Sequence, residues 1–200
     1  ANEAFHLNDA DELADEMNSR YPEFDVAKIY LDSYKQESTP GGERYPEAEA
    51  AIRNRVQNGC LLVTYLGHGG ERGWSHERIL DLNTISSWNN INRLPVFLTA
   101  TCELARFDDP AVNTAGELLV MNPEGGGIAM LTTTRVVFAG ANMAMNRAFY
   151  EFAFEDDNIS NLTLGRINML TKNEVSPSNS SKPNFSLLGD PALKLAYPRY

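Results

Sequence analysis

The stretch LLVTYLGHGG, residues 61–70, begins as an apolar run and ends in glycines around a histidine. A second stretch, PVFLTATC at residues 95–102, is apolar in the same way and ends on a cysteine. Short runs that are apolar throughout predict strands buried on both faces of a sheet. Helical patterns lie between these runs, so we expect an α/β fold, a mostly parallel sheet with helices on both faces.

Helical and strand patterns alternate along the rest of the chain. Two further strands are expected, one at 26–31 within FDVAKIYLDS and one at 128–133. The segment LLGDPALKL (187–195) predicts a final turn followed by a short strand or helix. Polar segments at 33–42 and 174–184 predict loops. The helices that we expect span residues 9–19, 46–59, 81–90, 114–127, 139–155 and 161–174.

Charge and composition exclude several classes of protein. The net charge is −10 and the sequence holds no basic stripe, which argues against a nucleic-acid partner and against an anionic membrane surface. No apolar run approaches the roughly 20 residues that a membrane helix needs. The chain opens without a methionine or a signal peptide, so we interpret it as a piece of a larger protein.

His68 and Cys102 follow two consecutive strands of the expected sheet. Parallel strands end at the same edge, about 4.8 Å apart, where ligands of such sheets bind. A histidine beside a thiol can take its proton, and the thiolate is the nucleophile. The sequence therefore suggests a Cys–His pair, with the Gly69 and Cys102 N–H groups as an oxyanion hole. The plainer alternatives are that Cys102 is a small buried apolar residue and that His68 is structural.

Cys60 occupies a different place from Cys102. It begins its strand, and seven or eight residues at about 3.3 Å each put it well over ~20 Å from the carboxyl edge. A disulfide needs Cα atoms within about 7 Å of each other. We therefore expect a free, buried Cys60 with a packing role.

Two other segments suggest binding sites of other kinds. HGGERGWSHE (68–77) holds two histidines and two glutamates, so zinc is an alternative, although the spacing fits no helical ligand pair. We expect His76 either at the protein surface or in contact with the residues that line the site, without touching the substrate itself. The glycines at 125–127 precede a strand, whereas a phosphate-binding loop follows one, so a nucleotide site is a weak alternative.

Three residues are candidates for a substrate groove: Trp74, Thr134 and Arg135. Arg135 can bind a carboxylate or a peptide carbonyl. Plain loop packing for Trp74 and solvent exposure without a role for Arg135 are the alternatives. Asp108 and Asp109 before a proline predict a turn.

Three stretches together resemble the gingipain family of cysteine peptidases, family C25: YLGHGGERGW (65–74), FLTATCELARFDDP (97–110) and NFSLLGDPALKLAYP (184–198). The resemblance runs from about Phe5 to Pro198. It implies a caspase-like α/β fold, with residues 1–200 as a single catalytic domain or subdomain truncated at both ends. It also implies that Cys102 is the nucleophile, His68 the catalytic histidine and Gly69 the oxyanion glycine.

The resemblance also implies an acidic residue that orients the histidine. In the family this acid precedes the first helix, so we expect it upstream of Ala1, with Asp9 and Asp11 as the nearest alternatives within the chain. Some members contain calcium, which implies a structural ion near Asp108 and Asp109 as an option; no other cofactor is expected.

The activity implied is that of a cysteine endopeptidase acting on polypeptides at a bacterial cell surface or in secretion. The likeness is to the members that remove C-terminal signals from cargo of the type IX secretion system, and those components are the implied partners. A catalytically inactive, peptidase-like binding scaffold is the main alternative, and a metal hydrolase is a third.

Overall fold

A four-stranded sheet forms the centre of the fold. The structure, a computed structural model, describes residues 4–154 and 162–197. The strands lie in the order β3-β7-β8-β9, and the first three are parallel while β9 is antiparallel to β8. This mostly parallel sheet confirms the expected fold class. The strands span Leu62–Leu66 (β3), Val96–Ala100 (β7), Ala129–Thr133 (β8) and Phe185–Gly189 (β9).

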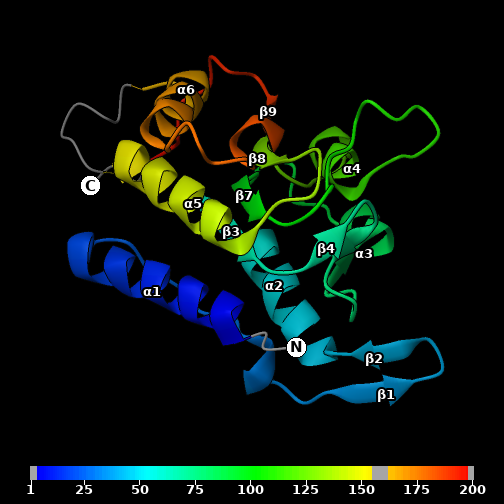
Figure 1. The fold of residues 1–200 in the computed structure, drawn as a ribbon. Coiled ribbons are helices and arrows are strands. Elements are labelled where there is room, and N and C mark those ends of the chain that lie inside the picture. Colours follow the sequence, from blue (N-terminus) through cyan, green and yellow to red (C-terminus); the bar gives the residue numbers. More distant parts are fainter. Residues whose placement is uncertain (1–3, 155–161, 198–200) are drawn as a thin grey trace.

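Helices cover both faces of this sheet (Figure 1). One face carries α2 (Pro46–Asn58), α3 (Leu82–Ser86) and α4 (Ala115–Met121), and the other carries α5 (Ala139–Phe154) and α6 (Leu164–Glu174). The first helix, α1 (Ala4–Arg20), contacts both β3 and α5. No helix in the described ranges is long and apolar enough to cross a membrane.

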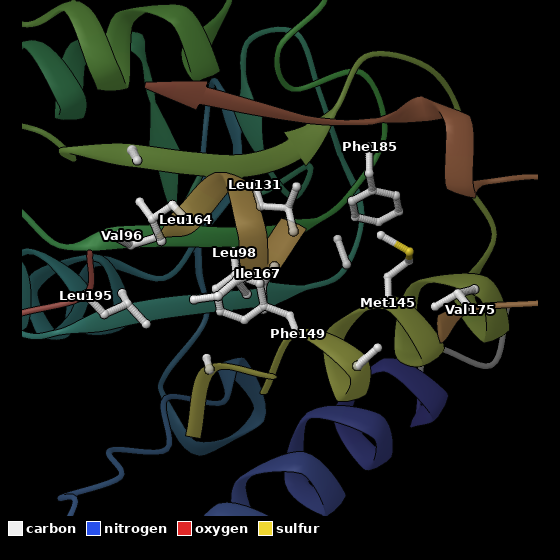
Figure 2. Close-up of a cluster of buried hydrophobic side chains, with 14 of the residues drawn as sticks. Val96, Leu98, Leu131, Met145, Phe149, Leu164, Ile167, Val175, Phe185 and Leu195 are labelled. Atoms are coloured by element: carbon white, nitrogen blue, oxygen red, sulfur yellow. The ribbon is translucent and has the colours of Figure 1, made fainter. Parts of the chain in front are cut away.

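The pleat of β7 distributes its side chains between two apolar clusters. Val96, Leu98 and Ala100 join α5 and α6 in one cluster, which Figure 2 shows. Phe97 points the other way and joins Met130 in the cluster against α2, α3 and α4. Successive residues of a strand face opposite sides, so an unbroken apolar run serves a sheet that is covered on both faces.

The prediction of a strand at residues 26–31 is wrong. Residues 26–31 are not a strand; they run irregularly along α1 and end in a short 3-10 helix, η1 (Leu31–Ser33). Lys28 Nζ lies 2.5 Å from carboxylate oxygens of both Asp11 and Asp15, and the Tyr30 hydroxyl donates to Asp11 at 2.9 Å. These bonds to α1 hold the segment beside the helix, a long-range effect that alternation along the sequence does not report.

The short strands were also missed. The loop expected at 33–42 contains most of a hairpin, β1 (Glu37–Thr39) and β2 (Gly42–Arg44), which extends away from the rest of the molecule (Figure 1). A second small sheet follows β3, made of the two-residue strands β4 (Gly69–Gly70), β5 (Gly73–Trp74) and β6 (Leu80–Asp81). Strands this short carry no readable periodicity. A 3-10 turn, η3 (Lys182–Asn184), precedes β9.

The glycines at 125–127 pack against Asn90. The buried Asn90 side chain accepts from the Gly126 N–H at 2.8 Å and donates to the Gly126 carbonyl at 3.0 Å. Gly126 has φ of 105°, and a Cβ there would collide with the Leu119 carbonyl. The glycines thus allow a tight turn between α4 and β8, and we assign them this structural role instead of a nucleotide site.

Replacing Asn90 by alanine should destabilise the fold. The change leaves a buried donor and acceptor of Gly126 without partners, so we expect a loss of about 2–4 kcal/mol in the free energy of unfolding. Urea denaturation followed by circular dichroism measures it. Asn89→Ala, at an exposed neighbouring position, is the control and should change stability by less than about 0.5 kcal/mol. Equal stabilities for the two variants would contradict the role given to Asn90.

Candidate active site

The ladder between β3 and β7 sets the relative position of His68 and Cys102. All five residue pairs of this parallel ladder have the same offset, from Leu62 opposite Val96 to Leu66 opposite Ala100. His68 and Cys102 keep that offset of 34 positions, and each lies two residues beyond the last pair of its strand. Both residues are therefore at the carboxyl edge of the sheet, as expected.

The Ala100 carbonyl links three elements just before Cys102. It accepts from the Gly67 N–H at 3.5 Å, which ties the end of β7 to the loop that carries His68. It also accepts from Nδ2 of Asn142 on α5 at 3.4 Å, and the Asn142 side chain is buried. Asn146, one turn further along α5, donates to the Asn142 carbonyl at 2.8 Å. The backbone next to the cysteine is thereby fixed to its neighbouring strand and to α5.

The two cysteines are both free and lie at opposite ends of the parallel strands. Cys102 is half-buried, packs against the cluster formed with α5 and α6, and directs its Sγ to the Val137 carbonyl at 3.8 Å. Cys60 precedes β3 at the amino edge and is half-buried, less than the expected full burial. Burial raises the pKa of the Cys60 thiol.

His68 is exposed, and its backbone is held in place. Its carbonyl accepts from the Tyr65 hydroxyl at 2.7 Å and from the Ser75 N–H at 2.8 Å. The His76 ring stacks against the His68 ring with centroids 6.2 Å apart, and the His6 ring from α1 meets it edge-on at 5.1 Å. All three histidines of the sequence therefore gather at this point. No local sequence signal connects His6 to the site, so the sequence alone does not predict that His6 lies there.

Glycine at position 69 is required by close packing against β7. A Cβ on Gly69 would collide with the hydroxyl of Thr101 and lie 2.8 Å from the Gly73 carbonyl. At Gly70, in contrast, a Cβ would meet nothing within 4 Å. Gly69 thus brings the loop after β3 against the residue that precedes Cys102, and the space next to it stays open.

The substrate-groove candidates are engaged in contacts within the protein. Trp74 is only 2% exposed and stacks on Tyr65, with ring centroids 4.3 Å apart, so the packing alternative describes its position. The N–H and the hydroxyl of Thr134 both donate to the Asn184 carbonyl, at 2.8 and 3.2 Å. These contacts place Trp74 in the core and Thr134 at the junction between two loops.

Arg135 forms a two-pronged ion pair with Asp108. Its two terminal nitrogens lie 2.9 and 2.5 Å from the two carboxylate oxygens, which joins the loop after β7 to the loop after β8. The guanidinium lowers the pKa of Asp108 to about 2. The sequence left Arg135 as a candidate for binding a substrate carboxylate or peptide carbonyl, and in the structure its guanidinium is bound to Asp108 of the same chain.

Acidic side chains near these loops are also paired. Asp109 accepts from the Ala111 N–H at 3.0 Å, which gives the turn that its proline predicted, and it lies 3.6 Å from Arg106. Within residues 4–154 and 162–197, no group of three or more His, Cys, Asp or Glu side chains is placed to hold a metal ion. This part of the chain therefore offers no set of ligands for the zinc ion that residues 68–77 suggested. A structural calcium ion near Asp108 and Asp109 stays a prediction.

A cavity of about 700 Å³ lies along β3 on the side away from β7. Apolar residues of α1, residues 25–32 and β3 line it, and it extends to His68 and His76. Asp11, one of the two alternatives for the histidine-orienting acid, lies on α1 and is committed to Lys28 and Tyr30.

Solved peptidase structures share this fold. The crystal structure of the Arg-specific cysteine proteinase gingipain R (RgpB) superposes with a TM-score of 0.73 at 19% identity, over 93% of this chain and 42% of that one. The complex of the Porphyromonas gingivalis RgpB pro- and mature domains matches equally well, with a TM-score of 0.73, 19% identity, and 93% and 43% of the two chains covered. A structure described only as a protease matches at 0.62 with 16% identity, over 71% of this chain and 37% of that one. The chain thus spans less than half the length of these proteins.

Sequence comparison assigns the family. Among curated proteins, none matches the chain. The model of peptidase family C25 matches residues 1–196, nearly the whole sequence. The gingipain fold, the strand-end positions of His68 and Cys102 and this match agree, and the chain belongs to peptidase family C25.

Proposed function

We propose that this chain is the catalytic part of a cysteine endopeptidase, with Cys102 as the nucleophile and His68 as its acid–base partner. The observation that carries the proposal is the shared offset of the two residues beyond the β3–β7 ladder. Adjacent strand ends bring two side chains within a few ångströms, about 4.8 Å for the backbones themselves. Membership of a peptidase family supports the same reaction class.

The reaction follows from the chemistry of the two groups. His68 takes the Cys102 proton, and the thiolate attacks the carbonyl carbon of a peptide bond, forming a C–S bond and a tetrahedral oxyanion. When the oxyanion collapses, the C–N bond breaks and the imidazolium gives its proton to the departing amine. Water, activated by the same imidazole, then attacks the thioester, which releases the carboxylic acid product and returns the thiol.

The oxyanion is assigned to the backbone N–H groups of Gly69 and Cys102. Gly69 abuts Thr101, so its amide lies beside the strand end that carries the nucleophile. Backbone donors that are fixed before the reaction stabilise developing charge without having to reorganise. The packing against Thr101 and Gly73 supplies that fixation.

For the biological role we propose a signal peptidase of the PorU type, which removes C-terminal signals from cargo of the type IX secretion system. The support is the resemblance of the segments at 65–74, 97–110 and 184–198 to PorU. The substrate is then the C-terminal signal region of a secreted polypeptide, and the site of action is the cell surface. An amine that replaces water at the thioester would give transpeptidation by the same residues.

Thiol labelling separates the peptidase from an inactive scaffold. Iodoacetamide at mildly acidic pH should label Cys102 at least about ten times faster than Cys60, because thiolate is the reactive form and burial raises the Cys60 pKa. Peptide mapping by mass spectrometry measures both rates. His68→Ala should slow the labelling of Cys102 and leave that of Cys60 unchanged. Slow labelling of both thiols, seen only after unfolding, would support the scaffold instead.

Replacing Gly69 by alanine should reduce peptide hydrolysis. The added methyl group collides with Thr101, so it displaces the amide that is assigned to the oxyanion. Loss of one oxyanion donor costs about 100- to 1000-fold in kcat. Gly70→Ala, where the methyl group meets open space, is the matched control and should keep most of the activity. Comparable losses in both variants would contradict the assignment.

A further inference from the structure

Three exposed apolar side chains stand on the loops beside Cys102. Phe107, on the loop after β7, is 52% exposed, and Val136 and Phe138, on the loop after β8, are 54% and 65% exposed. The ion pair between Asp108 and Arg135 joins these two loops one residue away from Phe107 and from Val136. We call these three residues the apolar rim.

The loop that carries two of these residues is held rigidly. Asn184 Nδ2 donates to the Val136 carbonyl at 3.1 Å, and the Phe138 N–H donates to the Ser181 hydroxyl at 3.1 Å. The Arg135 carbonyl accepts from the Glu103 N–H at 3.4 Å. The backbone from 134 to 138 is thus fixed by neighbouring segments, while the side chains of Val136 and Phe138 remain in solvent.

The apolar rim lies next to the Cys102 thiol. Cys102 Sγ contacts the carbonyl of Val137, the residue between Val136 and Phe138. The Val137 side chain turns inward and is 7% exposed, whereas its two neighbours turn outward. A peptide whose carbonyl carbon reaches Cys102 must pass next to this loop. Apolar surface that is fixed in place at a reaction centre binds the apolar part of a ligand.

Charges near the rim are compensated within the protein. Arg135 is engaged by Asp108, and Arg106 lies 3.0 Å from Glu71, 3.9 Å from Glu103 and 3.6 Å from Asp109. Each of these four carboxylates therefore has a guanidinium within salt-bridge distance. A basic or acidic substrate side chain would have to compete with these pairs, and an apolar one would not.

From these observations we infer that the enzyme selects peptides with a bulky apolar side chain on the acyl side of the scissile bond, and that Val136 and Phe138 provide this selectivity. The inference rests on the proposed function, because it needs Cys102 to be the nucleophile. The occupant of the rim is then the substrate peptide itself, bound through a leucine- or phenylalanine-like residue.

The test compares how fast two affinity reagents alkylate Cys102. Ala-Ala-Phe chloromethyl ketone and Ala-Ala-Lys chloromethyl ketone differ in the side chain next to the reactive carbon, and intact-protein mass spectrometry follows their addition. We expect the phenylalanine reagent to react about 10- to 100-fold faster, the usual discrimination of an apolar subsite. Iodoacetamide, which has no peptide part, reports the intrinsic reactivity of the thiol.

Variants assign the preference to the rim. Phe138→Ser and Val136→Ser should each lower the rate with the phenylalanine reagent by about 10-fold and leave the iodoacetamide rate unchanged. Met121→Ser on α4, at a position that is 74% exposed, is the matched control and should change neither rate. Unfolding midpoints in urea check that all three variants are folded.

The possible outcomes distinguish failure of the inferred selectivity from failure of the proposed peptidase function. If iodoacetamide labels Cys102 but the lysine reagent reacts faster than the phenylalanine reagent, the inference is wrong and the peptidase assignment stands. A preference for phenylalanine that persists in both rim variants also overturns the role of Val136 and Phe138. If Cys102 reacts with none of the reagents in the folded protein, both the proposed function and the inferred selectivity are wrong.

Discussion

The register between β3 and β7 is the constraint on which the proposed chemistry depends. In a sheet with both faces covered, a slip of one residue would move every side chain of β3 to the wrong face. Leu62 and Leu66 pack on the α5 side, and Val63 and Tyr65 on the other, so such a slip is penalised along the whole strand. The packing that stabilises the fold therefore also keeps His68 level with Cys102.

Several polar side chains are buried at the carboxyl edge of the sheet. Hydrogen bonds offset much of the free energy that these groups lose on leaving water. The Thr99 hydroxyl donates to Thr132 at 2.5 Å, and the Thr133 hydroxyl donates to the Thr101 carbonyl, so β7 and β8 are linked through side chains as well as through their backbones. Asn142 adds a bond from α5 to the same strand end. These bonds stiffen the strand ends, and within the described residues the buried Thr101 hydroxyl and the Asn142 Oδ1 are left without a hydrogen-bond partner. That rigidity suits a site in which a thiol and an imidazole on separate strands must stay in position.

The sequence predicted the buried part of the fold better than its surface. Apolar runs such as PVFLTA predict buried strands because every residue of β7 is covered. Residues 26–31 have a strand-like pattern, yet Lys28 and Tyr30 bind acidic groups of α1, a contact that local patterns do not encode. The positions of His68 and Cys102 followed from strand order alone. The approach of His6 to His68 did not, because it depends on how α1 lies against the end of β3.

A crystal structure of the protein bound to a peptide aldehyde tests the central claim most directly. The aldehyde forms a reversible bond with a nucleophilic thiol and leaves an oxygen where the oxyanion would be. The account predicts a bond to Cys102 Sγ, that oxygen within about 2.7–3.1 Å of the Gly69 N–H, and a His68 ring nitrogen within hydrogen-bond reach of the adduct. An aldehyde bound to Cys60, or a His68 ring directed away from an adduct at Cys102, would contradict it.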